Sequence, residues 1–133
     1  MELVRILPIL EAMLRCLIVD DSLAFLRAAR AHLEREGASV VGIALTSEEA
    51  VRLVGDLHPD VTLLDVHLAD ESGFELAGRL AREHSVEPGQ MILISTHTQE
   101  DFGDLVSQTP VAGFLSKSEL SLARIQTLLA ASR

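Results

Sequence analysis

The chain has 133 residues, of which 48% are hydrophobic and 23% charged, a composition that is ordinary for one globular domain and unlike that of a disordered protein. Its 20 acidic residues outweigh 11 Lys and Arg and give a formal net charge of −9. This balance argues against a nucleic-acid partner, because binding to a phosphate backbone needs clustered basic residues.

Residues 1–13 come first and are rich in Leu and Ile. Charged residues and a proline interrupt every apolar run, so no stretch approaches the roughly 18 residues of a membrane span, and no small-residue cleavage site follows. We therefore predict a cytoplasmic protein without membrane contact, with residues 1–13 as an N-terminal extension and residues 14–133 as one domain. The alternative for the extension is an amphipathic segment with one apolar face, formed by Leu3, Ile6, Leu7 and Leu10.

The first predicted strand is "LRCLIVD", residues 14–20, and it contains the one cysteine of the chain, Cys16. A single cysteine in an apolar run indicates a buried structural thiol in a reducing compartment rather than a nucleophile. The predicted helix that follows begins near Ser22, its N-cap, and ends at Gly37.

The alternation of strands and helices continues to the end of the chain. Four more apolar runs are predicted strands: "SVVGIAL", "DVTLLDV", "QMILIST" and "VAGFLS". Four more segments are predicted helices: "TSEEAVRLVGDL", capped by Thr46 or Ser47, "GFELAGRLAREH", the weaker "QEDFGDLVSQT" and "SELSLARIQTLLAAS". Continuous apolar runs indicate strands buried on both faces. The predicted fold is therefore α/β, a doubly wound five-stranded parallel sheet flanked by five helices in a single domain.

Polar residues stand at the carboxyl ends of the predicted strands, where ligands bind in sheets of this kind. In chain order they are Asp20 and Asp21, Asp65, Ser95 and Thr96, and Lys117. Convergence of three carboxylates, a hydroxyl and an ammonium group predicts a site for a hard divalent cation such as Mg²⁺, which prefers oxygen ligands and often binds phosphate oxygens as well. A cation would also explain why two like charges stand side by side after the first strand.

Four motifs together resemble the receiver domain of bacterial two-component response regulators, over residues 14–130. They are "VDDS", "LLDVHLADESGFEL", "LIST" and "GFLSK". Each motif alone is weak, but their order and spacing are specific. The resemblance implies the sheet order 2-1-3-4-5 and a receiver domain over residues 14–133.

The resemblance also implies a role for each acid. Asp65 corresponds to the phosphoacceptor, Asp21 to a direct Mg²⁺ ligand, and Asp20 to an acid that holds the metal through water. His67 would contribute its backbone carbonyl to the metal, and Mn²⁺ is a possible substitute for Mg²⁺.

Further positions correspond to residues that hold or report the phosphoryl group. Ser95 matches the switch hydroxyl, Lys117 the invariant lysine, and Phe114 the aromatic switch, while Gly73 matches a glycine eight residues beyond the acceptor. Three residues, one of them His67 again, flank the entry path to the phosphoryl group and are predicted to modulate its lifetime: His67, Thr96 and His97.

The predicted function is that of a signalling domain rather than a conventional enzyme. It would accept a phosphoryl group from a sensor histidine kinase or a phosphotransfer protein, and would catalyse its own phosphorylation and autodephosphorylation. Phosphorylation would then change the surface around the fourth helix and fifth strand, which an unknown downstream protein would bind. Whether the domain forms a homodimer stays open at this point.

Two other interpretations remain. An aspartate-nucleophile phosphatase of the dehalogenase type also uses Mg²⁺, a hydroxyl and a lysine, but its nucleophile follows the first strand, whereas Asp65 follows the third. A pseudo-receiver that only binds a partner is the second alternative, and the complete set of acids, hydroxyl and lysine speaks against it.

Overall fold

The computed structural model describes residues 13–132. Residues 1–12 of the predicted N-terminal extension lie outside this range. Within it, no helix has both the length and the apolar character needed to cross a membrane.

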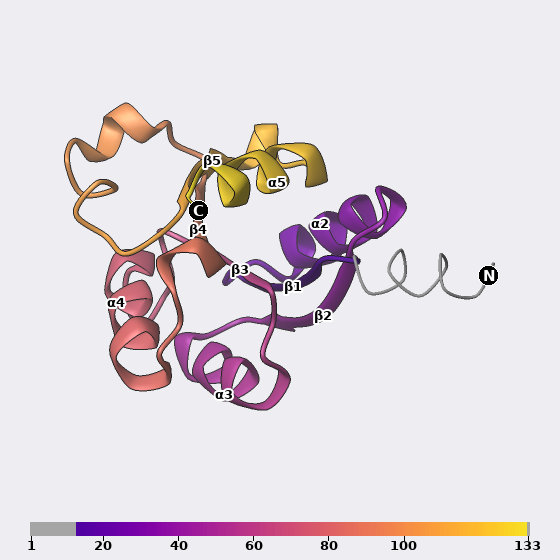
Figure 1. Cartoon of the computed structure of the whole chain (residues 1–133), viewed down its shortest axis with the longest axis horizontal. Helices are drawn as coiled ribbons and strands as arrows, with labels where there is room; N and C mark the ends of the chain where they lie inside the picture. The colour runs from indigo at the N-terminus through magenta and orange to yellow at the C-terminus, as the bar shows by residue number, and fades with distance from the viewer. Residues whose placement is uncertain (1–12, 133) are drawn as a thin grey trace.

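A five-stranded parallel sheet forms the centre of the domain (Figure 1). Its strands are β1 (Arg15–Val19), β2 (Ser39–Ala44), β3 (Val61–Asp65), β4 (Met91–Ser95) and β5 (Gly113–Ser116). They lie in the order β2-β1-β3-β4-β5, and every neighbouring pair is parallel. The expected sheet and strand order are therefore confirmed.

Helices cover both faces of the sheet (Figure 1). They are α2 (Leu23–Arg35), α3 (Ser47–Leu57), α4 (Gly73–His84) and α5 (Leu122–Ala131). Helices α2 and α5 contribute to one apolar cluster, and α3 and α4 contribute to the other. Successive residues of β1 alternate between these clusters, with Ile18 in the first and Val19 in the second. This two-sided burial explains why the strand sequences are apolar throughout.

The buried position of Cys16 agrees with the sequence prediction. Its side chain is fully buried in the cluster that faces α2 and α5. Burial raises the pKa of the thiol to about 12, and the nearby Asp60 carboxylate adds to this effect. The thiol is therefore protonated at neutral pH and packs as a small apolar group.

Side-chain caps define where the helices begin. Ser22 accepts a hydrogen bond from the backbone N–H of the third residue of α2, and Thr46 does the same for α3. Thr46 is therefore the cap of α3, and Ser47 is its first helical residue. At the end of α2 the chain turns through Gly37, whose φ of +106° lies in the region that favours glycine.

The prediction that residues 99–109 form the fourth of five helices is wrong, because the described residues contain four α-helices and none of them lies in this segment. In its place lies a short 3₁₀ helix, η2 (Gln99–Phe102), followed by turns. Gly103, with φ +58° and ψ −127°, leaves the helical conformation directly after η2. Pro110 also disfavours helix in the residue before it. The surface expected around a fourth helix is therefore built from η2 and turns.

The last helix begins later than the sequence pattern predicts. Ser121 is extended, with φ −154° and ψ 156°, and its side chain accepts the backbone N–H of Arg124. Helix α5 therefore starts at Leu122, while the preceding residues form the 3₁₀ helix η3 (Lys117–Glu119). A third short 3₁₀ helix, η1 (Pro88–Gln90), precedes β4.

Candidate functional site

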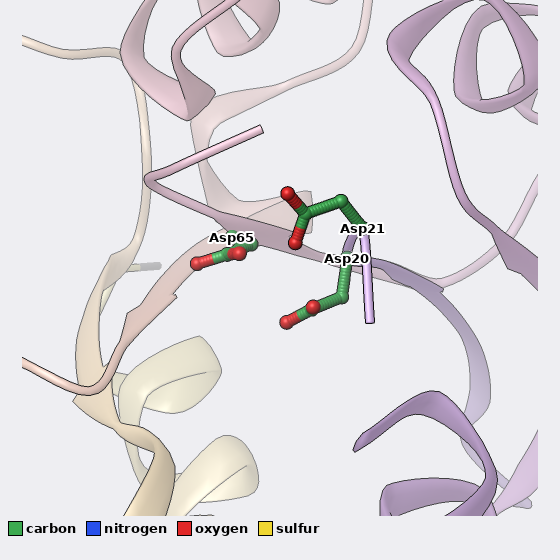
Figure 2. Close-up of side chains that lie close together, drawn as sticks. All are labelled: Asp20, Asp21 and Asp65. Carbon is green, nitrogen blue, oxygen red and sulfur yellow. The ribbon is translucent and has the colours of Figure 1, made fainter. Parts of the chain in front are cut away.

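Three carboxylates meet at the carboxyl end of the sheet (Figure 2). Asp20 and Asp21 directly follow β1, and Asp65 is the last residue of the neighbouring strand β3. One oxygen atom of each side chain lies within 4.8 Å of the others. Asp20 and Asp65 are buried, whereas Asp21 is exposed. The fold thus brings together the three acids that the sequence analysis singled out.

Lys117 supplies positive charge to this cluster. It follows β5 directly as the first residue of η3. Its Nζ atom lies 2.6 Å from Oδ2 of Asp20 and 3.6 Å from Oδ2 of Asp65. Its side chain is 16% exposed, so these ion pairs are largely shielded from water. Because one ammonium group faces three carboxylates, the site keeps an excess of negative charge.

The electrostatic environment makes Asp65 harder to ionise than an ordinary aspartate. Burial raises its pKa from 3.8 to about 6, and the neighbouring Asp20 carboxylate contributes to this rise. Lys117 and the backbone N–H of His67 oppose it, and Asp21 adds a smaller increase. A cation between the carboxylates would favour their ionised forms.

The donor atoms fit a hard divalent cation. Oδ1 of Asp20 accepts the backbone N–H of Ser22 at 2.8 Å. Oδ2 of Asp20 is buried and accepts no hydrogen bond of good geometry, although the Lys117 ammonium is close. Three carboxylates whose oxygen atoms lie within 4.8 Å of one another, with one ammonium group beside them, match the oxygen ligand set of Mg²⁺ or Mn²⁺.

Ser95 and Thr96 lie at the end of β4, next to β3. Ile94 is the register partner of Asp65, and Ser95 follows it as the last residue of β4. The buried Ser95 hydroxyl accepts the backbone N–H of His97 at 3.0 Å. Thr96 is exposed. The hydroxyl groups are thus placed at the same edge of the sheet as the carboxylates.

The two histidines near the site form a pair. The rings of His67 and His97 are 5.4 Å apart between centroids, in an edge-to-face arrangement, and both residues are exposed. Both rings lie about equally far from Phe102, with centroid distances of 5.9 and 6.1 Å. The backbone N–H of His67 also donates to Oδ1 of Asp65 at 3.4 Å.

Phe114 is buried on the face of the sheet that packs against α3 and α4. Its ring lies 5.8 Å from that of Phe102 in η2. Phe102 therefore contacts both the predicted aromatic switch and the histidine pair. Phe102 was not among the predicted site residues, because the weak helical pattern around it does not show which way its ring points.

Gly73 is required by a close approach of two backbone segments. A Cβ atom at this position would overlap the carbonyl oxygen of Asp65 and lie 2.9 Å from its carbonyl carbon. The backbone N–H of Gly73 donates to the carbonyl of Val66 at 2.8 Å. The start of α4 is thus held directly against the end of β3, which positions the Asp65 backbone.

Two further contacts anchor the loop between β3 and α4. Asp70 accepts hydrogen bonds from the backbone N–H and the hydroxyl of Ser47, the first residue of α3. The hydroxyl hydrogen bond lowers the pKa of Asp70. Glu71 pairs with Arg79 of α4. These residues were not predicted, because polar loop residues form no sequence pattern that identifies their partners.

One aromatic residue beside Lys117 was also missed. The ring centroid of Phe25, in the first turn of α2, lies 4.3 Å from the Lys117 ammonium nitrogen. An apolar residue on the buried side of a predicted helix is ordinarily assigned to the core, so its sequence context gave no indication of this contact.

Comparisons with known proteins agree with this geometry. The family model described as the response regulator receiver domain matches residues 16–130. The response regulator GacA of Pseudomonas viridiflava is 34% identical over 107 residues, covering 79% of this chain and 49% of the relative. The chain therefore spans about half the length of that protein.

Solved structures share the fold. The signal receiver domain of the putative response regulator NarL from Mycobacterium tuberculosis superposes with a TM-score of 0.74 at 25% identity, covering 90% of this chain and 96% of that one. A LuxR-family two-component response regulator from Aurantimonas sp. SI85-9A1 gives a TM-score of 0.78 over 92% of this chain and 89% of that one. Its 23% identity supports the fold alone.

Proposed function

The chain belongs to the response regulator receiver domain family, and from this premise we propose that Asp65 is its phosphoacceptor. The observation that carries the proposal is the position of Asp65, buried at the end of β3 beside two other carboxylates and 3.6 Å from the Lys117 ammonium. The family match does not favour the dehalogenase-type phosphatase considered from the sequence.

The reaction is a transfer of one phosphoryl group. A carboxylate oxygen of Asp65 attacks phosphorus, and a new oxygen–phosphorus bond forms as the bond from phosphorus to the donor imidazole nitrogen breaks. The electron pair of that bond stays on the imidazole. Lys117 neutralises charge on the phosphoryl oxygens, and the Ser95 hydroxyl donates a hydrogen bond to one of them. Positioning and electrostatics thus account for most of the catalysis.

The three carboxylates, with the backbone carbonyl of His67, would hold Mg²⁺ or Mn²⁺. When bound, such an ion offsets the repulsion between the carboxylate and the incoming phosphoryl group. Asp21 and Asp65 are proposed as direct ligands, and Asp20 as a ligand through water. Asp20 also holds Lys117 in place at 2.6 Å.

Phosphorylation would be passed on through the β4–β5 side of the domain. A phosphoryl group adds a charge of about −2 and strong hydrogen-bond acceptors, which draws the Ser95 hydroxyl toward it. Phe114 then changes its packing against Phe102, so the altered surface lies at η2 and β5. His67, Thr96 and His97 are proposed to control access of water to the phosphoryl group.

The proposed phosphoryl donor is a sensor histidine kinase or a phosphotransfer protein in the cytoplasm. The first test replaces this protein donor with a small molecule. Acetyl phosphate serves this purpose because it requires no partner protein.

The experiment is intact-mass measurement after incubation with acetyl phosphate, with and without Mg²⁺. We expect the mass of one phosphoryl group to be added only with Mg²⁺, and none to be added to Asp65→Asn. Asp104→Asn is the matched control, since Asp104 is an exposed aspartate in the turns after η2. Full labelling of Asp65→Asn would overturn the assignment, and an unlabelled wild type would indicate a pseudo-receiver.

A further inference from the structure

We infer that Phe25 is a positioning residue, which holds the ammonium group of Lys117 between Asp20 and Asp65. The inference rests on the proposed function, since it gives Lys117 a part in phosphoryl transfer. The Lys117 Nζ atom lies over the Phe25 ring, 4.3 Å from its centroid. A cation within about 6 Å of an aromatic face is attracted by the negative charge density of that face.

The backbone places Phe25 with little freedom. Ser22 caps α2 by accepting the backbone N–H of Phe25 at 3.2 Å. The backbone N–H of Ser22 in turn donates to Oδ1 of Asp20 at 2.8 Å. Asp20 meets the Lys117 ammonium, which lies over Phe25. These contacts form a closed ring of interactions that connects the end of β1, the first turn of α2 and the residue after β5.

Lys117 needs such a constraint, because a lysine side chain has many rotamers and ordinarily extends its ammonium group into water. Its two acidic partners hold the Nζ atom, at 2.6 Å from Asp20 and 3.6 Å from Asp65. The Phe25 ring covers the ammonium group as well, and the Lys117 side chain is only 16% exposed. Exclusion of water strengthens the attraction between cation and ring.

This arrangement gives Phe25 a consequence for the reaction. A preorganised ammonium group stabilises charge on the transferring phosphoryl oxygens without first being reordered. Without the ring, Lys117 would spend part of its time turned toward water and away from Asp65. Removal of the ring is therefore expected to slow phosphorylation while the three carboxylates remain in place.

Phe25 also packs against the apolar cluster that faces α2 and α5, so a loss of packing must be separated from a loss of the aromatic face. Phe25→Leu keeps an apolar side chain and removes the face. Phe25→Tyr keeps the face. Phe74→Leu is the matched control, because Phe74 is also half-buried in the first turn of a helix, α4, on the opposite side of the sheet.

Two measurements are made on the wild type and all three variants. The first is the rate of phosphorylation by acetyl phosphate at saturating Mg²⁺, with thermal unfolding recorded in parallel. The second is the NMR chemical shift of the Lys117 ε-methylene group, which a ring at this distance displaces. We expect Phe25→Leu to lower the rate by about three- to tenfold and to abolish the displaced shift. Phe25→Tyr should preserve both, and Phe74→Leu should preserve the shift, because Phe74 lies on the opposite side of the sheet from Phe25.

A wild-type rate in Phe25→Leu would overturn the inference. An equal loss of rate in Phe25→Tyr and Phe25→Leu would also overturn it, because packing alone would then explain the effect. If the wild type takes up no phosphoryl group, the proposed function fails, whereas the methylene shift still tests whether Phe25 holds Lys117. The two failures are therefore distinguishable.

Discussion

The Asp65→Asn substitution tests whether a buried carboxylate at the end of β3 destabilises the folded domain in the absence of metal. Asp65 is 4% exposed, and burial together with Asp20 raises its pKa from 3.8 to about 6. The folded protein therefore binds a proton at Asp65 more tightly than the unfolded chain does. The contribution of Asp65 to the stability of the folded protein is therefore most favourable below pH 4, and it falls as the pH rises toward about 6.

The size of the effect follows from the same pKa. One pKa unit corresponds to about 1.36 kcal/mol between two protonation states, so the rise to about 6 corresponds to a loss of about 3 kcal/mol above pH 6. Asparagine carries no charge at any of these pH values. We expect Asp65→Asn to increase the free energy of unfolding by up to about 3 kcal/mol at pH 7.5, and by little near pH 4.

The assay is urea unfolding with a chelator present, at pH 4 and at pH 7.5, for the wild type, Asp65→Asn and Asp104→Asn. The exposed Asp104 reports the effect of the same chemical change elsewhere, which should stay within about 0.5 kcal/mol. Added Mg²⁺ should stabilise the wild type and reduce the difference, because it binds the folded state. A variant less stable than the wild type at pH 7.5, or a difference independent of pH, would refute the reasoning.

Two further substitutions test the structure around the site. Gly73→Ala should lower the free energy of unfolding by about 3 kcal/mol or more, because its Cβ would overlap the Asp65 backbone. The control is Gly55→Ala, at a solvent-exposed position within α3, which should raise the free energy of unfolding by about 0.5–1 kcal/mol. Equal effects of the two substitutions in urea unfolding would contradict the close approach at Gly73. Asp70→Ala should cost about 1 kcal/mol at pH 7, since Asp70 accepts two hydrogen bonds at the start of α3. Because the pKa of Asp70 is lowered, this stabilisation is present above pH 4 and is lost as the pH falls through the folded-state pKa. A difference in unfolding free energy between the wild type and Asp70→Ala that stays the same at pH 7 and pH 3 would argue against this role of the Asp70 carboxylate.

Much of the fold follows from local features of the sequence. Apolar runs of strand length identify β1, β3 and β4 almost to the residue, because each strand is buried on both faces. Ser22 and Gly37 mark the ends of α2 through side-chain capping and a positive φ, both of which depend on neighbouring residues. No local feature of this kind indicates the order of the strands, and only the family resemblance predicted it.

The position of the acids was also predictable, since the carboxyl ends of parallel strands lie at one edge of a sheet. Asp20, Asp21 and Asp65 therefore meet, as the sequence analysis expected. Which of these acids are buried could not be predicted in the same way, because Asp21 is exposed beside two buried acids. Which side chain points inward depends on the direction of the chain after β1, where the strand pattern no longer applies.

Tertiary structure decided the remaining features. Phe102, Leu105 and Val106 have the spacing of one helical face, yet the chain leaves the helical conformation at Gly103. Leu105 is 49% exposed as a result. Phe25 and Lys117 lie far apart in the chain, and their contact exists because α2 and the end of β5 flank the same face of the sheet. Periodicity and capping are properties of adjacent residues, so the sequence predicts them directly. A contact between distant elements depends on how those elements pack, which only the assembled sheet determines.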